Sequence, residues 1–598
     1  MSGAGDIAVP AGPARRLPAG LIPFAVLACA ALALPWGGND YWALIATRAA
    51  IYWILVSGLN LVVGFAGQLA IGYVALFAVG AYTASILAAG NVLPELHPAL
   101  SLLAAAVVGA GCGVVVGLPA LRLRTFYFAM TTLGFATIVT QVALGWQDVT
   151  GGGIGLSGPA LPAPFDTAWG LYYLCLALAA FCTWMTANIA GSRFGRALVA
   201  LREAEVAAEA AGVAKPALLV SVFLFAGTVA GLAGGLFASL QTYITPDAFT
   251  FDLSLLFFIA VLIGGRGSIL GPLLGTIILT LLPEVAAPLA AWSTFVYALL
   301  LLVIVLAAPG GIAALLDFGS RRALPRNRAI HPQLAALQAL IGDAEAGREV
   351  MELRGVVLAF GAVRAIDGLD LDVRPHQVHG LIGPNGSGKT TTLNVISGYY
   401  RPQAGSLALG GATLGNEAPS SRARHGIART FQTPRSVGEA TVLDNVMVGS
   451  TIDGHASFAE AMLCLPRHRH DEQRIRALAV LALEAVGLAA LADIRADRLQ
   501  HSELRFMEIA RALVLRPRFL LLDEPAAGLS PDEIKRLGGL IKAISATGVS
   551  VLLVEHHADL IFEICDHVTV LNLGQVLACG PAAEIRVHKE VVSAYLGG

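Results

Sequence analysis

The residues best suited to chemistry form two short stretches in the second half of the chain. Residues 383–390, GPNGSGKT, follow an apolar stretch, precede a plausible helix and match the pattern G-x-x-x-x-G-K-[ST]. Glycines in this pattern let backbone N–H groups face phosphate oxygens, and the helix N-terminus adds positive potential. We expect Lys389 to reach the β- and γ-phosphates and the Thr390 hydroxyl to ligate Mg²⁺. The predicted phosphate-binding residues are Gly383, Pro384, Asn385, Gly386, Ser387, Gly388, Lys389, Thr390 and Thr391.

The second stretch supplies acidic groups. Residues 519–525, FLLLDEP, are an apolar run that ends in two acids, which is typical of a buried parallel strand that delivers carboxylates at its C-terminal edge. Asp523 suits a Mg²⁺ shell, and Glu524 suits positioning or activation of the attacking water. A further apolar stretch ends at His556 and His557. One of these is a candidate γ-phosphate sensor, although histidines at a strand edge are usually incidental.

An α/β domain at residues 349–598 is predicted to position these groups. From Met351 the pattern changes to short strands; Leu369 and Leu371 alternate with Asp370 and Asp372, as in a half-buried strand. Residues 317–348, rich in Arg, Ala and polar residues, indicate a linker with a helix near residues 334–341.

Composition separates this domain from the first half of the chain. The chain has 598 residues, of which 56% are hydrophobic and 13% charged, and its mean hydropathy is +0.71. This balance excludes one soluble globular protein, a disordered chain and a secreted disulfide scaffold. Charged residues are sparse before residue 330, which indicates a bilayer-embedded half. The net charge of −2 argues against a nucleic-acid partner, and seven scattered cysteines without a C-x-x-C spacing argue against a zinc site or disulfide framework.

Apolar runs predict about eight to ten spans within residues 21–316, because a span needs about 20 apolar residues. The runs are 21–34, 42–64, 68–90, 99–118, 126–144, 169–190, 217–240, 254–264, 270–282 and 292–308. Arg48 interrupts the second run, 254–264 and 270–282 are short enough to be broken or re-entrant, and 21–34 is also typical of a cleaved signal peptide. With residues 1–20 cytoplasmic and every run crossing, the Arg- and Lys-bearing loops and the α/β domain all lie inside.

Two kinds of loop stand out. Residues 146–168, which contain TGGGIGLSGP, and residues 241–253 are predicted outside, either as partner contacts or as flexible connections. Residues 194–212, here called the coupling segment, are Ala-rich, carry charge and end in Gly212 at an expected C-cap position. They are predicted to form either a short amphipathic helix at the inner membrane surface or a solvated loop helix.

The motifs of the second half together resemble an ABC-transporter ATPase over nearly all of residues 351–598. By this resemblance the nucleotide is ATP, Phe360 stacks on adenine, and Gln432 occupies the Q-loop, where it binds nucleotide and metal. His556 then becomes the switch histidine, catalytic together with Glu524, and the metal ligands are Thr390, Gln432 and Asp523.

Departures from that family concern the signature and the D-loop. The family's LSGGQ signature falls on residues 499–503, which read LQHSE, and Ser530 stands where Asp is commoner. In the family, the signature of one ATPase caps the phosphate loop of another. Side chains from Gln500 and His501, and acidic Glu503, are expected to weaken this cap. The resemblance therefore implies an asymmetric pair, in which this chain's Walker residues work against a partner's intact signature.

The first half resembles the permease of the branched-chain amino-acid importer family, in LNLVVGFAGQLAIGYVALFAVGAYTASIL (59–87), LPALRLR (118–124), TGGGIGL and SRFGRALVALREAEVAAEAAGV (192–213). The chain is thus expected to be a natural fusion of permease and ATPase in the bacterial inner membrane, with the ATPase cytoplasmic. The resemblance implies ATP-driven import of branched-chain or related hydrophobic amino acids, or of urea, amides or aromatic acids. It also implies a second permease, a second ATPase, an extracytoplasmic solute-binding protein and a coupling helix at 194–212.

Two rival functions remain at this point. An exporter also places a membrane domain ahead of an ATPase, but it has six long spans with extended charged intracellular extensions, which are not seen here. A membrane scaffold or sensor that binds ATP without hydrolysing it fits the degenerate signature, but intact Glu524 and His556 argue against it.

Overall fold

The computed structural model describes residues 31–34, 39–90, 95–123, 125–285, 310–316, 330–342 and 349–593, with isolated residues between 292 and 307. Its contacts divide the chain into two compact units. The helical unit contains residues 1–198, 215–321 and 458–464, and the α/β unit contains residues 199–214, 322–457 and 465–598. The predicted N-terminal segment 1–20 and most of the predicted linker 317–348 lie outside the described residues.

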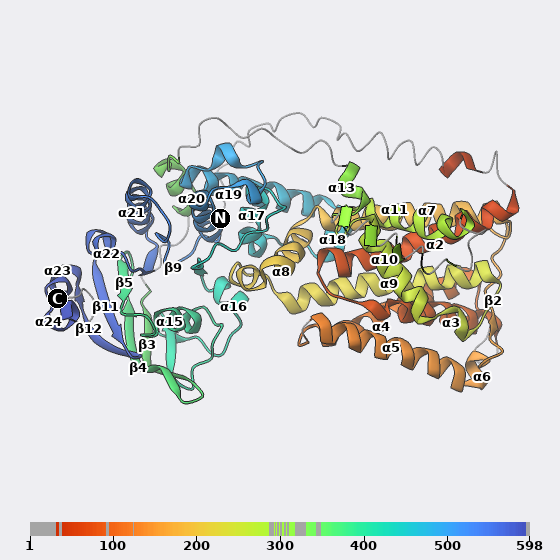
Figure 1. Cartoon of the computed structure of the whole chain (residues 1–598), viewed down its shortest axis with the longest axis horizontal. Helices are drawn as coiled ribbons and strands as arrows, with labels where there is room; N and C mark the ends of the chain where they lie inside the picture. Colours follow the sequence, from red (N-terminus) through yellow and green to blue (C-terminus); the bar gives the residue numbers. More distant parts are fainter. Residues whose placement is uncertain are drawn as a thin grey trace, which may run out of the picture. The chain divides into compact units, whose positions relative to one another are not determined.

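The helical unit consists of long apolar helices (Figure 1). Among the described residues, seven helical stretches are long and apolar enough to cross a membrane, so the chain is a multi-pass membrane protein. The elements are α2 (Asp40–Asn60), π-helical η2 (Leu61–Phe65), η3 (Ile71–Tyr73), α3 (Val74–Ala89), α4 (Pro98–Ala120), α5 (Thr125–Gly145), α6 (Gln147–Thr150), α7 (Ala168–Ala190), α9 (Lys215–Gln241), η4 (Pro246–Ala248), α10 (Phe251–Gly264), α11 (Gly271–Val285) and α13 (Ile312–Leu316).

The predicted runs between residues 42 and 282 are helical over most of their length. The run 254–264 is extended backward into a stretch from Pro246 to Gly264 that is long enough to span, whereas the helix from Gly271 remains shorter. The predicted runs 21–34 and 292–308 lie largely outside the described residues.

Close backbone approach holds α4 against α9. A Cβ atom at Gly109 would lie 2.4 Å from the carbonyl oxygen of Gly227, and one at Gly227 would lie 2.2 Å from that of Gly109. Because lipid removes most of the hydrophobic drive between helices, such small-residue contacts are a main source of helix association in a bilayer.

The two loops predicted outside lie together. Strand β1 (Leu156–Ser157), from the Gly-rich loop, pairs antiparallel with β2 (Tyr243–Ile244). The pairing agrees with the expectation that both loops emerge on one side of the membrane.

The α/β unit contains two sheets (Figure 1). The larger has the order β12-β11-β5-β10-β9-β8, in which all neighbours pair parallel except β11 and β12. Its strands are β5 (Val378–Ile382), β8 (Ile427–Arg429), β9 (Phe519–Asp523), β10 (Ser550–Val554), β11 (His567–Asn572) and β12 (Gln575–Pro581). The smaller sheet is antiparallel, with the order β4-β3-β6-β7: β3 (Met351–Phe360), β4 (Val363–Val373), β6 (Ala404–Leu409) and β7 (Ala412–Thr413).

The strands that carry the candidate site are buried on both faces. In β9, Phe519 and Leu521 join the core against the smaller sheet, whereas Leu520 and Leu522 join the core against the helices. Burial on both faces explains why these strands are continuous apolar runs in the sequence.

The helices of the α/β unit are α14 (Leu334–Ile341), α15 (Lys389–Ile396), α16 (Pro419–Arg424), α17 (Val442–Met447), α19 (Pro466–Val486), α20 (His501–Leu513), α21 (Pro531–Ala546), α22 (Ala558–Ile564), α23 (Ala582–Arg586) and α24 (Lys589–Val591), with 3₁₀ turns η6 (Val448–Asp453), η7 (Ala489–Leu491) and η8 (Ala496–Arg498).

Each unit contains one segment from the other part of the chain. Residues 199–214, most of the coupling segment, belong to the α/β unit, and residues 458–464 belong to the helical unit. There, α18 (Phe458–Met462) contacts the end of α7: Asn188 Nδ2 donates to the Met462 carbonyl at 2.9 Å. The ring of Phe458 packs edge-on against that of Phe194, with centroids 5.3 Å apart. No feature of the sequence pattern predicted this second exchange.

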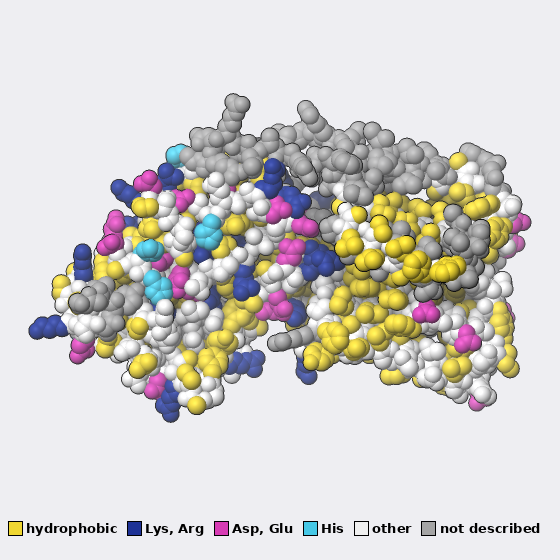
Figure 2. Space-filling view, in the orientation of Figure 1, with side chains coloured by type: hydrophobic (Ala, Val, Ile, Leu, Met, Phe, Trp, Pro, Cys, Tyr) yellow, Lys and Arg dark blue, Asp and Glu magenta, His cyan; other side chains and the backbone are white. Residues whose placement is uncertain are grey.

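Surface composition differs between the units. Figure 2 shows hydrophobic side chains gathered over the helical unit, whereas Lys, Arg, Asp and Glu are spread over the α/β unit. The difference agrees with a lipid environment for one unit and water for the other.

A buried histidine makes the stability of the α/β unit depend on pH. His379 in β5 is 3% exposed, and its Nε2 lies 2.9 Å from Thr569 Oγ1. Burial, aided by nearby His567, lowers the pKa of His379 from 6.5 to about 4. The unfolded chain therefore binds this proton at higher pH than the folded chain, and stability falls as the pH drops from 6.5 toward 4.

We expect the α/β unit to lose about 2 kcal/mol of unfolding free energy between pH 7 and pH 5 through His379. His379→Gln removes this part of the loss, which thermal unfolding at the two pH values measures. His588→Gln, at an exposed position, is the matched control and keeps the full pH dependence. An unchanged pH dependence in His379→Gln would contradict the assignment.

Candidate functional site

The predicted phosphate loop lies between β5 and α15, in the strand, loop and helix order that the sequence indicated. A buried strand ends at Ile382, and α15 begins at Lys389. Gly383 has φ of 150°, and a Cβ atom there would lie 2.1 Å from the Leu571 carbonyl oxygen. Glycine is therefore required by both conformation and space. The exposed Asn385 and Gly386 form the open side of the loop.

Lys389 is folded back onto this loop. Its Nζ donates to the carbonyls of Gly383 at 2.7 Å and Pro384 at 2.9 Å. Burial lowers the pKa of Lys389, whereas the nearby carboxylates of Glu524 and Asp523 oppose that shift. The Lys389 ammonium group is thus held by the loop carbonyls, near the two acids at the end of β9. In this position it could bind a phosphate on the loop.

Asp523 ends β9, and its two carboxylate oxygens have different surroundings. Its Oδ2 accepts from Arg429 Nη2 at 3.1 Å, and its buried Oδ1 accepts no hydrogen bond from the described residues. Burial raises the pKa of Asp523, and Arg429 acts against that shift. An unpartnered buried carboxylate oxygen fits a cation shell, and the exposed Thr390 hydroxyl and the Gln432 amide add oxygen donors of the kind that Mg²⁺ prefers.

Glu524, Gln432 and His556 come together, although up to 124 positions separate them in the sequence (556 − 432). Gln432 Nε2 donates to Glu524 Oε2 at 2.8 Å, and His556 Nε2 lies 3.0 Å from Glu524 Oε1. Glu524 itself has φ of 47°, the left-handed region that non-glycine residues rarely adopt. Such strain clusters at functional sites, and here it aims the carboxylate at both partners.

Basic and acidic residues of α20 hold the Q-loop in place. The buried Arg505 donates through Nη1 to the Phe431 carbonyl at 2.6 Å, and through Nη2 to the Gln432 carbonyl. Glu508 accepts from the Arg435 backbone N–H at 3.0 Å. Sequence reasoning missed these residues, because their partners lie 73 and 74 positions away in the chain.

The signature residues 499–503 form hydrogen bonds at the N-terminus of α20, so the first backbone N–H groups of this helix are partly capped. Gln500 precedes α20, and its backbone N–H donates to Glu503 Oε2 at 2.7 Å. His501 Nε2 lies 3.1 Å from the Ala527 carbonyl oxygen. A carboxylate that already caps the helix opposes a phosphate at the same N-terminus. Ser530, the unusual D-loop residue, caps α21 together with Glu533.

Phe360 lies at the exposed end of β3, 48% exposed. Its ring packs edge-on against that of Tyr400, with centroids 5.1 Å apart. Sequence reasoning found Phe360 only through family resemblance and missed its aromatic partner.

The coupling segment departs from the single helix predicted for it. Helix α8 (Arg193–Ala210) is broken at Ala204, where φ is −145° and ψ is 62°. In the α/β unit, Ala204, Ala207 and Ala210 form an apolar cluster with Phe431, the neighbour of Gln432. The expected glycine end is present, since Gly212 has φ of 87°.

Comparisons with known proteins match both halves. Residues 41–308 match the family model "Branched-chain amino acid transport system / permease component", residues 366–527 match "ABC transporter", and residues 575–598 match "Branched-chain amino acid ATP-binding cassette transporter".

Among curated proteins, the chain is 39% identical over 251 residues to the high-affinity branched-chain amino acid transport ATP-binding protein BraF of Pseudomonas aeruginosa, covering 42% of this chain and 98% of that protein. It is 36% identical over 249 residues to LivG of Escherichia coli K12, with 42% and 98% covered. A crystal structure of a nucleotide-free ATP-binding cassette from an ABC transporter is 31% identical, with 42% of this chain and 100% of that chain covered and a TM-score of 0.37.

Apart from the exchanged segments 199–214 and 458–464, these matches follow the two units, with permease likeness in the long apolar helices and ATPase likeness around the predicted phosphate loop. The ATPase likeness shows that the chain binds ATP and couples ATP hydrolysis to transport. The chain belongs to the branched-chain amino acid ABC transporter family, with a permease component and an ATP-binding component joined in one polypeptide.

Proposed function

We propose that this chain is one half of a bacterial inner-membrane importer that uses ATP to take up branched-chain or related hydrophobic amino acids. The observation that carries the proposal is the Glu524 carboxylate, held by Gln432 and His556 beside a phosphate loop in a chain that also carries a permease. The relatives named for branched-chain amino acid transport support the solute class.

The site's own residues account for the hydrolytic step. The loop N–H groups and Lys389 bind the phosphates, and the Glu524 carboxylate orients and accepts a proton from the attacking water. Gln432 and His556 hold that carboxylate from opposite oxygens. Thr390, Gln432 and Asp523 would hold Mg²⁺, which would supply positive charge that offsets charge on the phosphates.

Closure of the ATPase is proposed to move the coupling segment. The segment packs against Phe431, so displacement of the Q-loop reaches it through direct contact. With the coupling segment and the α/β unit on the cytoplasmic side, this motion opens the permease inward to a solute delivered by an extracytoplasmic binding protein.

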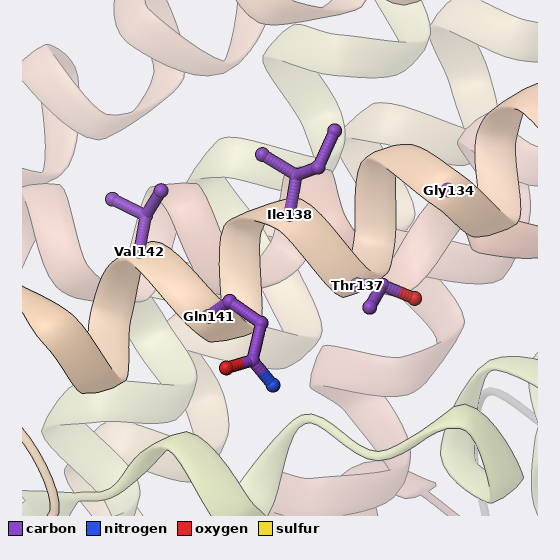
Figure 3. Close-up of a pocket in the computed structure, with 5 residues that line it drawn as sticks. All are labelled: Gly134, Thr137, Ile138, Gln141 and Val142. Atoms are coloured by element: carbon purple, nitrogen blue, oxygen red, sulfur yellow. The ribbon is translucent and has the colours of Figure 1, made fainter.

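A second permease is proposed to complete the solute path. Helix α5 is the least buried of the candidate spans, and a pocket of about 570 Å³ lies along it (Figure 3). The pocket is lined by Gly134, Thr137, Ile138, Gln141 and Val142. The Thr137 hydroxyl donates to the Leu133 carbonyl of its own helix at 3.1 Å, but the amide of Gln141 is costly against lipid, which favours a protein or solute neighbour for this face.

A second, different ATPase is proposed because the signature of this chain is self-capped. In a homodimer, the self-capped signature, with its Gln500–Glu503 hydrogen bond, would face the nucleotide at both sites. In a heterodimer, the intact signature of the partner would face the nucleotide bound by this chain, so one efficient site remains.

Co-purification and uptake test this function. The full chain is isolated from native membranes with its associated subunits and reconstituted, and uptake of radiolabelled leucine is measured with ATP on the α/β side. We expect a second ATPase and a second permease in the assembly, and uptake that requires both ATP and a binding protein. A self-paired chain with full activity would contradict the asymmetric pair. ATP-driven efflux would contradict the proposed import and favour the exporter function.

A further inference from the structure

A buried guanidinium lies behind the nucleotide site. Arg429 ends β8, and its side chain is 3% exposed. Its Nη2 donates to Asp523 Oδ2 at 3.1 Å, and its Nη1 donates to Asn394 Oδ1 at 2.6 Å and to Ser397 Oγ at 2.8 Å. One side chain therefore joins the carboxylate that ends β9 to the C-terminal end of α15, the helix that begins at the phosphate loop.

The same guanidinium lies against two aromatic rings. Its Cζ is 5.2 Å from the ring centroid of Phe431 and 6.0 Å from that of Tyr399. The backbone N–H of Tyr399 donates to the Asn394 carbonyl at 2.8 Å, so the last turn of α15 fixes where this ring lies. Cation–π attraction in a desolvated setting then ties the rings to the position of Arg429.

Both rings contact the coupling segment. Phe431 and Tyr399 pack against its alanines in one apolar cluster, and the Tyr399 hydroxyl donates to the backbone carbonyl of Val206. Small alanine side chains allow the rings to reach the backbone itself. Tyr399 therefore contacts the coupling segment both through its ring and through its hydroxyl group.

We propose that Arg429 and Tyr399 form a mechanical link that carries motion from Asp523 to the coupling segment, in addition to the Q-loop contact at Phe431. The link rests on the proposed function of residues 194–212 in coupling. When nucleotide binding shifts the end of β9 relative to α15, the bonds of Arg429 to both elements cannot all be kept. Because the surrounding core is close-packed, the rings and the Val206 carbonyl must move with it.

Tyr399 is a positioning residue, since it acts through Arg429 and the coupling segment. A merely structural role would lower thermal stability and leave the amount of solute moved per ATP unchanged. The deciding readout is therefore the ratio of leucine uptake to phosphate release in the same proteoliposomes.

Tyr399→Phe keeps the ring and removes the hydroxyl donor. In the full chain with its co-purified subunits, we expect the uptake-to-hydrolysis ratio to fall about threefold to tenfold, the factor that one lost hydrogen bond confers. Hydrolysis without solute stays near the wild-type rate. Thr547→Val is the control, because it also removes a hydroxyl group that donates to a backbone carbonyl, that of Ile544 at 2.7 Å, at the end of α21, and it leaves the ratio unchanged.

Arg429→Lys tests the other end of the link. Lysine keeps the charge but lacks the planar fork that binds three acceptors, so the ratio falls here too. In the double variant with Tyr399→Phe, the loss is no greater than that of the more severe single variant, because both act on one path.

Hydrogen exchange across residues 199–214 gives a readout that needs no known solute. A non-hydrolysable ATP analogue changes exchange in this segment in the wild type and in Thr547→Val, and has a reduced effect in Tyr399→Phe. An ATP effect that is equal in Tyr399→Phe and wild type, or absent from both, overturns the link. Absence of leucine uptake together with an intact exchange response instead overturns only the proposed solute.

Discussion

Glu524→Gln is expected to reduce ATP turnover by about a hundredfold or more, the usual contribution of a positioned general base. The change removes the negative charge and the proton acceptor. It keeps the size of the side chain and one oxygen acceptor, for one of the two nitrogens of Gln432 and His556 that lie 2.8 and 3.0 Å from the separate carboxylate oxygens. ATP binding therefore persists, and leucine uptake falls with turnover. Phosphate release, nucleotide binding and uptake are measured on the same purified assembly.

The matched control is Glu439→Gln, the same chemical change at an exposed acid shortly after the Q-loop. It should leave turnover and uptake near wild type. Turnover and uptake that survive Glu524→Gln would remove the catalytic assignment and favour the ATP-binding scaffold.

Lys389→Ala is expected to weaken ATP binding itself, by about tenfold to hundredfold, because a charge-assisted hydrogen bond to phosphate is lost. Its Nζ is held at 2.7 Å from the Gly383 carbonyl oxygen, so the cation is already positioned before nucleotide arrives. Affinity is measured with a fluorescent ATP analogue.

Lys535→Ala on α21, at an exposed position, is the control and should bind ATP normally. Thermal unfolding without nucleotide separates lost affinity from lost fold. The pattern across the two sites is diagnostic: Glu524→Gln keeps binding and loses turnover, whereas Lys389→Ala loses both. Normal ATP affinity in Lys389→Ala would contradict the assigned phosphate loop.

Local periodicity predicted the elements that carry the site. The alternation around Leu369 and Leu371 is a half-buried strand in the structure, and the helix expected near residues 334–341 is α14. The phosphate loop was predictable because strand, glycines, lysine and helix are adjacent in the chain. Glu524 was predictable because an apolar run ended in two acids.

Long-range pairs were not predictable in this way. Arg429 meets Asp523 across 94 positions, and Arg505 meets the Phe431 carbonyl across 74. Neither arginine belongs to a local pattern, since its partner is set only by the order of strands and helices. Ala204 shows the same limit: helix propensity favours a continuous helix, but packing against Phe431 accompanies a break there.

The hydrogen bond that caps the signature helix could not be predicted from the sequence, for a different reason. Sequence reasoning expected the acidic charge of Glu503 to repel a phosphate. The structure adds that this carboxylate bonds the Gln500 N–H of its own helix, so the helix end is already capped. Whether a residue caps its own helix or faces a partner depends on its rotamer, which composition does not specify.

The central claim is that ATP chemistry at Lys389 and Glu524 acts on a segment of the permease from the same side of the membrane. Single cysteines at Glu203, Glu439 and Ile154, introduced into a cysteine-free chain, are labelled with a membrane-impermeant maleimide in right-side-out and inside-out vesicles. Ile154, which is 80% exposed in the Gly-rich loop, should label only from outside, and the other two positions only from inside. Labelling of positions 203 and 439 from opposite faces would contradict the account.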